Sequence, residues 1–227
     1  MKKPEILYES KSFIVINKPA GLCVQGGKGI KISLDKIIEM RLGIRPFLVH
    51  RLDRETSGLI IVAKNKESAA GFSKLFESRQ KNGIIKRYLA ICKGKPASIK
   101  GLIKNDLIIH GTVKKCETRW RQIEIFKDSA GEEYSMLELE LGTGRLHQIR
   151  RHLAMQGNPI IGDDKYGDFT LNHKLRKTIK LRNLLLHASQ IIIPKSPCAQ
   201  NLDLISSLPI HFKQFAAQIA APNASEL

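Results

Sequence analysis

The chain has 227 residues, of which 42% are hydrophobic and 26% are charged, so its composition is that of a globular protein and gives no indication of disorder. Its 38 Lys and Arg residues outnumber 21 Asp and Glu residues and give a formal net charge of +17. Solubility alone asks for a net charge of about 2–8 in a small domain, so this excess indicates a polyanionic partner such as a nucleic acid.

The cysteines and the hydropathy pattern narrow the class of protein. Cys23, Cys92, Cys116 and Cys198 lie far apart with no Cys-x-x-Cys pair, which excludes a zinc knuckle and a dithiol redox motif. No window approaches the roughly 18 apolar residues of a membrane span, and the N-terminus lacks the apolar stretch of a signal peptide. We expect a cytoplasmic monomer without metal or membrane contact, folded as a single domain over residues 1–227.

The first predicted elements are a strand, a loop and a helix. Residues 12–16 have the pattern of a strand, which the Pro and Gly of residues 17–21 end. The glycine-rich segment at residues 25–29 does not match the Walker A pattern, so we interpret it as a flexible basic loop. Ser33 is placed to cap a helix that ends at Gly43.

Two apolar runs, residues 47–49 and 59–63, enclose a polar block from His50 to Gly58. The runs have the length and β-branched content of buried strands, so rigid scaffold holds the block at both ends. Loops held in this way often carry function. We therefore look for chemistry in this block first.

Asp53 is the residue of most chemical interest in the block. Its neighbours Arg51 and Arg54 are cations, and a carboxylate beside cations stays ionised. An ionised, positioned carboxylate can serve as a nucleophile or as a base. The alternative is an ordinary ion-pair network of Arg, Asp and Glu on a solvated loop.

The rest of the chain mixes helical and strand patterns without a regular βαβ repeat. We expect a helix after Asn65, a strand over residues 86–92, a hairpin over residues 119–126 and 134–141, a strand around residues 191–193 and a terminal helix within residues 212–227. This mixture predicts an α+β fold. Tyr88 lies in the strand over residues 86–92, and taken alone it is expected only to pack.

An arginine lies on the apolar stripe of the helix predicted over residues 146–157. The stripe has members at i, i+3, i+4 and i+7: Leu146, Ile149, Arg150 and Leu153. A guanidinium aimed at a core must find an anion, because it stays charged, and Asp53 is the partner that we expect. Alternatively, Arg150 extends past the stripe to solvent.

We expect no catalytic function for the residues next to Arg150. Arg151 and His152 are expected to turn away from the apolar stripe. His147 and His152 are five residues apart, which puts them on different faces, and no cysteine nearby completes a metal site. We expect ordinary hydrogen bonding or phosphate contact for both histidines.

The residues from His50 to Leu59 resemble the signature block of the RluA-type RNA pseudouridine synthases, whose aspartate is the catalytic residue. Further segments resemble the other motifs of this family in the same order: residues 17–21, 86–90, 144–150, 162–167 and 185–188. Ordered motifs over about residues 12–194 are far more specific than any single motif. The resemblance implies the α+β pseudouridine-synthase fold, with a mixed, largely antiparallel sheet, flanking helices and a central basic cleft.

The activity that this resemblance implies is the isomerisation of uridine to pseudouridine in a structured ribosomal or transfer RNA. The C1′–N1 bond breaks, the uracil rotates and a C1′–C5 bond forms, so the resemblance implies no cofactor and no metal. Asp53 would act by attack on the sugar, by attack on the base or by proton abstraction at C2′, and these alternatives stay open.

The resemblance also implies roles for other residues. Arg150 would orient Asp53 and keep it ionised, and Tyr88 would stack on the uracil and assist proton transfer. Arg51 would fill the space that a flipped base leaves. The substrate-binding residues that we expect are Arg51, His50, Arg54, His147 and Lys18.

The sequence departs from the family pattern at two positions. Leu146 stands where the family usually has Thr or Ser, and Arg151 stands where an apolar residue is common. We also expect no N-terminal S4-type RNA-binding domain, because the first motif begins at residue 17. Contacts to the RNA backbone are expected from two basic groups: residues 174–182, and Lys114, Lys115, Arg119 and Arg121.

Two rival functions come from other classes. The first is a non-catalytic RNA-binding or RNA-chaperone protein on the same fold. The second is a hydrolytic glycosidase that uses Asp53 and Glu55, but both carboxylates lie beside arginines, so neither has a setting that keeps it protonated as the acid.

Overall fold

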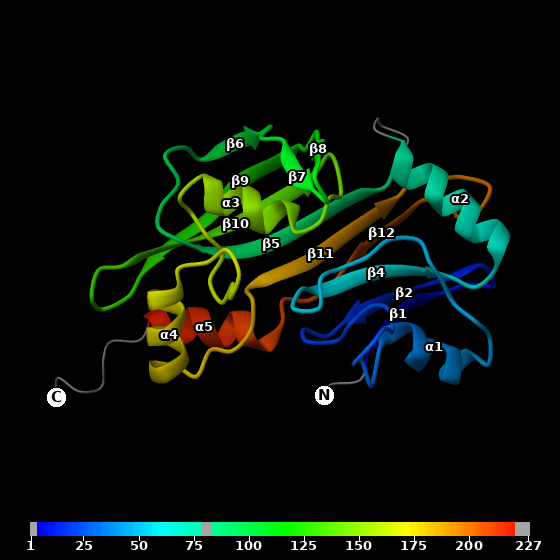
Figure 1. Ribbon diagram of the computed structural model, residues 1–227, viewed down its shortest axis with the longest axis horizontal. Coiled ribbons are helices and arrows are strands. Elements are labelled where there is room, and N and C mark those ends of the chain that lie inside the picture. The colour runs from blue at the N-terminus through cyan, green and yellow to red at the C-terminus, as the bar shows by residue number, and fades with distance from the viewer. Residues whose placement is uncertain (1–3, 79–82, 221–227) are drawn as a thin grey trace. The chain divides into compact units, whose positions relative to one another are not determined.

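The computed structural model describes residues 4–78 and 83–220, and Figure 1 shows the arrangement of their helices and strands. The chain divides into two compact units. The first unit contains residues 1–86 and 188–207, and the second contains residues 87–187 and 208–227. The expectation that both act as one catalytic domain stays a prediction.

The first unit is built on strands around β4. Its elements are β1 (Glu5–Glu9), β2 (Phe13–Lys18), α1 (Leu34–Leu42), β3 (Phe47–Leu48), β4 (Ser57–Ala63), α2 (Lys66–Glu77), most of β11 (Leu186–Ile193) and β12 (Leu202–Ile205). The strand order is β1-β2-β4-β11, β3 also pairs with β4, and β12 pairs with β11. The pairings of β2 and β3 with β4, of β1 with β2 and of β11 with β12 are antiparallel.

Strand β4 lies at the centre of the core of the first unit. All seven residues of β4 are buried, which is typical of a strand covered on both faces. Helix α2 packs against this strand, and Phe72 meets Phe13 of β2 edge to face, with ring centroids 4.8 Å apart. The predicted caps are confirmed at Asn65, which accepts the Ser68 N–H, and at Gly43, which ends α1 in the left-handed region. Ser33 precedes α1 as expected, but its side chain makes no cap hydrogen bond.

The second unit is built on a four-stranded, antiparallel arrangement in the order β5-β10-β9-β6. Its elements are β5 (Ile85–Lys93), β6 (Lys100–Ile103), β7 (Leu107–Ile109), β8 (Thr112–Lys114), β9 (Thr118–Lys127), β10 (Glu133–Leu141), α3 (Gln148–Met155), α4 (Phe169–Thr178) and α5 (Ile210–Ala220). The predicted hairpin is confirmed as β9 and β10. Its turn is closed by the Gly131 N–H, which donates to the Asp128 carbonyl.

One helix was not expected from the sequence, and the expected terminal helix begins earlier than residue 212. The basic stretch at residues 174–182 begins inside a helix, α4, whose N-terminus Asp168 caps by accepting the Leu171 N–H. The terminal helix begins at Ile210, and residues 221–227 of the predicted range lie outside the described residues.

Gly58 is the second residue of β4, at the end of the polar block, and only glycine fits there. Its φ is +108°, and a Cβ at this position would overlap the backbone of Ala188 in β11. Both strain and collision therefore oppose any other residue.

We expect Gly58→Ala to lower the free energy of unfolding by about 2–4 kcal/mol, because backbone strain and overlap add. Gly29→Ala is the matched control, since Gly29 also has a positive φ of +80° but has open space where a Cβ would lie. Urea unfolding followed by circular dichroism measures both. Equal losses in the two variants would show that strain alone acts at Gly58.

Candidate active site

Asp53 lies on the loop between β3 and β4 in the first unit. Its side chain is half-buried, while Arg51, Arg54 and Glu55 are exposed. Leu52 and Thr56 are buried and hold the loop to the core on either side of the aspartate. The predicted loop between two strands is therefore confirmed, but β3 is only two residues long and half-buried, whereas a buried strand was expected over residues 47–49.

Lys18, at the end of β2, ties two loops together. Its side chain is fully buried, and Nζ donates hydrogen bonds to the carbonyls of Pro19 at 3.1 Å, Leu22 at 2.9 Å and Arg54 at 3.1 Å. Two more hydrogen bonds join the same loops: the Gly21 N–H donates to the Arg54 carbonyl at 2.8 Å, and Arg54 Nε donates to the Gly21 carbonyl at 3.2 Å. The peptide next to Asp53 is thus held in place.

The buried ammonium also shapes the electrostatics of the loop. Burial lowers the pKa of Lys18 to about 8, and the nearby carboxylates of Glu55 and Asp53 oppose that shift. Lys18 is still a cation at neutral pH. Its three protons bind carbonyl oxygens, so the structure gives it a positioning function, and contact with substrate stays a prediction.

His50 holds the start of the loop. Its Nε2 accepts the Ile61 N–H of β4 at 2.9 Å, just beyond the last β3–β4 pair, and the ring packs on Phe76 with centroids 4.7 Å apart. Because Nε2 is an acceptor, the neutral ring carries its proton on Nδ1. Burial and the neighbouring Lys86 cation lower the pKa of His50 to about 3. The side chain predicted to bind substrate is therefore seen anchoring the loop.

The second unit contains a buried ion pair. Arg150 in α3 is 5% exposed and Asp163 is 1% exposed, and Nε and Nη2 of the guanidinium each donate to a carboxylate oxygen at 2.8 Å. The prediction that Arg150 enters the core and meets an anion is confirmed. Sequence reasoning missed Asp163 as a partner, although its motif was recognised. Asp53 belongs to the first unit and Arg150 to the second, and the predicted pairing of these two residues stays a prediction.

Further contacts fix this ion pair. Asp163 Oδ1 also accepts the N–H groups of Lys165 and Tyr166, and the Tyr166 ring lies 5.3 Å from the Arg150 guanidinium. The Tyr166 hydroxyl is 3.0 Å from His147 Nδ1. Burial raises the pKa of Asp163, but the hydrogen bonds from Arg150 and the two amides outweigh it and lower the pKa. The carboxylate is therefore ionised.

The expectation that His152 turns away from the apolar stripe did not predict that this side chain is buried. Its side chain is fully buried, with Nδ1 2.9 Å from Thr118 Oγ1 and Nε2 2.9 Å from the Asn105 carbonyl. Helix α3 is short and has buried residues on two of its sides, so the single apolar stripe expected from the sequence does not account for all of its buried residues. Hydrogen bonding of His147 and His152, as predicted, is confirmed.

Tyr88 lies in β5 of the second unit, 5% exposed and opposite Leu139 of β10. Among the residues that the structure describes, no group of three or more His, Cys, Asp or Glu could hold a metal ion. Within residues 4–78 and 83–220, no helix has the length and apolar content needed to cross a membrane.

Comparison with known protein families assigns both sites to one family. Residues 12–155, which include the Asp53 loop and the Arg150 helix, match the RNA pseudouridylate synthase family. The chain belongs to this family. It is an RNA pseudouridine synthase, an isomerase, and the predicted fold and activity are confirmed.

Relatives match nearly the whole chain. The ribosomal large subunit pseudouridine synthase C of Rickettsia bellii is 34% identical over 225 residues, covering 92% of this chain and 70% of the relative. That of Haemophilus ducreyi is also 34% identical, covering 95% of this chain and 69% of the relative. The structure of human RNA pseudouridylate synthase domain containing 4 has a TM-score of 0.76 at 27% identity and covers 95% of this chain and 92% of its own. Human RNA pseudouridylate synthase domain containing 1 has a TM-score of 0.70 at 25% identity, covering 97% and 96%.

We expect the stability of this pseudouridine synthase to depend on the protonation of His50. Its folded pKa of about 3 lies below the usual 6.5, so between these values the unfolded chain binds a proton that the folded chain does not. Stability from this group is present above pH 6.5 and is lost towards pH 3, with a slope of about 1.4 kcal/mol per pH unit. His50→Gln keeps an acceptor for Ile61 but should lose this slope in unfolding measured from pH 7 to pH 4. His173→Gln, at an exposed position of α4, should keep the wild-type slope.

We expect Asp163→Ala to lower the free energy of unfolding by about 3–5 kcal/mol, because it leaves the Arg150 cation buried without its partner. The neighbouring Asp164 pairs with Arg176 at 2.8 Å, but their side chains are 70% and 46% exposed. Asp164→Ala should therefore cost less than about 1 kcal/mol. Denaturant unfolding compares the two variants, and similar losses would contradict the importance of burial.

Proposed function

We propose that this enzyme converts uridine to pseudouridine in large-subunit ribosomal RNA, with Asp53 as the catalytic carboxylate. The relatives from Rickettsia bellii and Haemophilus ducreyi, each 34% identical, are both named for the ribosomal large subunit. This similarity favours ribosomal RNA over transfer RNA, the other substrate that we considered. A ribosomal substrate agrees with the cytoplasmic location that we propose, and the monomeric state stays a prediction.

The single observation that carries the assignment of Asp53 is how its loop is held. The side chain is half-buried, so it can reach a ligand, while the adjacent peptide is bound by a fully buried lysine. A catalytic group must be held in one geometry to be effective, because orientation supplies much of the rate enhancement. Neither Arg54 nor Glu55 combines partial burial with such anchoring.

The proposed reaction is balanced without any co-reactant. The C1′–N1 bond of the nucleotide breaks, the uracil turns, and C1′ bonds to C5. The proton that leaves C5 is matched by a proton at N1, so the product is an isomer of the substrate. Asp53 supplies the carboxylate that acts on the sugar, on the base or on the C2′ proton.

Two residues of the second unit are proposed to complete the site. Arg150 is held by Asp163 through Nε and Nη2, each at 2.8 Å, and we propose that the guanidinium fixed in this way orients Asp53. Because Asp163 already balances its charge, we propose that Arg150 acts on Asp53 chiefly through orientation. Tyr88 is proposed to stack on the uracil and to assist proton transfer.

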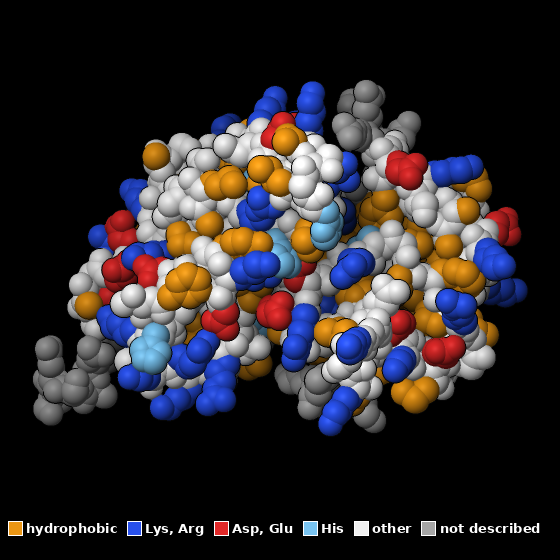
Figure 2. All heavy atoms as spheres, in the orientation of Figure 1, with side chains coloured by type: hydrophobic (Ala, Val, Ile, Leu, Met, Phe, Trp, Pro, Cys, Tyr) orange, Lys and Arg blue, Asp and Glu red, His pale blue; other side chains and the backbone are white. Residues whose placement is uncertain are grey.

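The proposed substrate contacts differ in how well the structure supports them. Arg51 and Arg54 are exposed beside Asp53, and a planar guanidinium can stack on bases once the target uridine leaves its stack. His147 is supported by its contact with Tyr166, whose ring packs against the Arg150 guanidinium. The central basic cleft stays a prediction. Lys and Arg side chains spread widely over the face of the molecule seen in Figure 2 and are available for RNA contacts.

We expect Asp53→Asn to reduce pseudouridine formation by at least about 10⁴-fold while RNA affinity changes less than twofold, since the amide keeps the shape but not the charge. Release of tritium from RNA labelled at C5 of uridine measures the reaction, with a transcript of large-subunit ribosomal RNA as the substrate. Glu55→Gln, at the exposed acidic neighbour, is the control and should retain activity within a few fold.

The rival functions give different outcomes in this assay. Full activity of Asp53→Asn would exclude Asp53 as the catalytic residue. Release of free uracil would indicate the hydrolytic glycosidase, and a wild-type protein without product would favour a non-catalytic RNA-binding protein. Pseudouridine mapping of total RNA with and without the enzyme then separates ribosomal from transfer RNA targets.

A further inference from the structure

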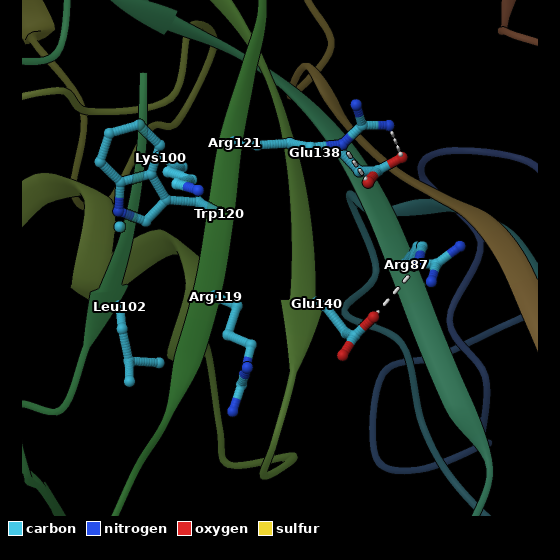
Figure 3. A pocket seen from close by; sticks show the side chains of 9 residues that line it. Arg87, Lys100, Leu102, Arg119, Trp120, Arg121, Glu138 and Glu140 are labelled. Carbon is cyan, nitrogen blue, oxygen red and sulfur yellow. Dashed lines mark hydrogen bonds and ion pairs between the residues drawn. The ribbon is translucent and has the colours of Figure 1, made fainter. Parts of the chain in front are cut away.

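A groove with a volume of about 570 Å³ lies on the second unit, and none of the residues that line it is assigned to the active site. Figure 3 shows the side chains that line it, which come from β5, β6, β9 and β10. The lining residues are Arg87, Lys100, Gly101, Leu102, Arg119, Trp120, Arg121, Glu138 and Glu140. Four cations thus face two carboxylates.

Strand register places the charged side chains in two rows across one face. In the first row Lys100 lies opposite Arg121, which lies opposite Glu138. In the second row Leu102 lies opposite Arg119, then Glu140 and Arg87 follow. Directly opposite residues of antiparallel strands share a face, so all these side chains project from the same side.

This face is the opposite one from that of Tyr88. Successive residues of a strand point to opposite faces, so Arg87 and Tyr88 diverge. The row on the Tyr88 side runs through Leu139, which is buried like Tyr88, to Trp120 and Gly101, which lie near the sheet edge and also line the groove. The charged rows therefore form a surface separate from the proposed uracil contact.

The carboxylates neutralise only part of the positive charge. Arg121 makes a two-point ion pair with Glu138 at 2.7 and 3.1 Å, and Arg87 contacts Glu140 at 3.1 Å, as the dashed lines in Figure 3 show. Hydrogen bonding from Arg121 lowers the pKa of Glu138, which stays ionised. These two cations are therefore balanced within the groove.

Lys100 carries the excess charge of the groove, and Arg119 is paired only with a carboxylate outside it. Lys100 is exposed and makes no ion pair among the residues that the structure describes, yet it lies directly opposite a second cation, Arg121. Like charges in this position destabilise a sheet. Arg119 is 66% exposed and makes an ion pair at 3.5 Å with Glu117, which does not line the groove. An anion bound between the rows would relieve this repulsion.

We propose that this groove binds the phosphodiester backbone of the RNA substrate outside the active site. The inference rests on the proposed RNA substrate and adds a second contact surface to it. Exposed cations that neutralise phosphates release counterions, which favours binding to RNA of any sequence. Exposed Leu102 supplies an apolar surface beside the cations. Lys100 could instead protect the edge strand β6 from pairing with another chain, and the test separates these functions.

The test compares Lys100→Gln/Arg119→Gln with Lys66→Gln/Lys74→Gln, which removes the same charge from exposed positions of α2. The probe is the transcript of large-subunit ribosomal RNA, and its dissociation constant is measured by filter binding between 50 and 200 mM salt. We expect the groove variant to bind roughly three- to tenfold more weakly at the higher salt, and the slope of log K against log salt to fall by about 1.4–1.8. The control should change affinity less than twofold.

The outcomes are distinct. Equal effects in the two double variants would overturn the proposal, and aggregation of the groove variant without a change in affinity would assign edge protection to Lys100. Thermal unfolding verifies that the groove variant folds, and the single variant Lys100→Gln gives the same comparison if it does not. Asp53→Asn separates this inference from the proposed mechanism, because it should lose product formation while keeping the full salt dependence of RNA binding.

Discussion

The burial of one cation, Lys18, is the constraint on which the candidate site depends. A charged amine removed from water is destabilising by several kcal/mol unless hydrogen bonds replace its hydration. Three backbone carbonyls do so here, and one of them belongs to Arg54, the residue after Asp53. The hydrogen bonds that stabilise the buried Lys18 in the first unit therefore also fix the position of the loop that carries Asp53. Any arrangement that released this loop would leave the ammonium without partners in the core.

The second unit uses the same physical principle with a different pair of charges. Arg150 and Asp163 are almost fully buried and join a helix to the loop that follows it, and two backbone amides complete the carboxylate's hydrogen bonding. Such geometry specifies one arrangement, because neither ion can be removed without exposing the other to an apolar environment. The exposed ion pairs along β9 and β10 lack this constraint and can exchange partners with a ligand.

The alternation of side chains along a strand lets one element serve two surfaces. Tyr88 points to the buried face of β5, whereas Arg87 points to the charged groove. A pseudouridine synthase must both grip a large RNA and act on one uridine within it. Strands that carry chemistry on one face and charge on the other provide both surfaces within a small chain.

The sequence by itself determined the local elements, the polar loop that carries Asp53, the burial of Arg150 and the family. Periods of 2 and 3.6 residues and ordered motifs are local properties, so they can be read before folding. Tertiary structure decided which groups meet: Asp163 as the anion for Arg150, the carbonyls around Lys18, and the burial of His152. It also set the register that assembles the groove from four strands. Such contacts join residues far apart in the chain, and their pairing depends on strand register and helix packing rather than on any local pattern.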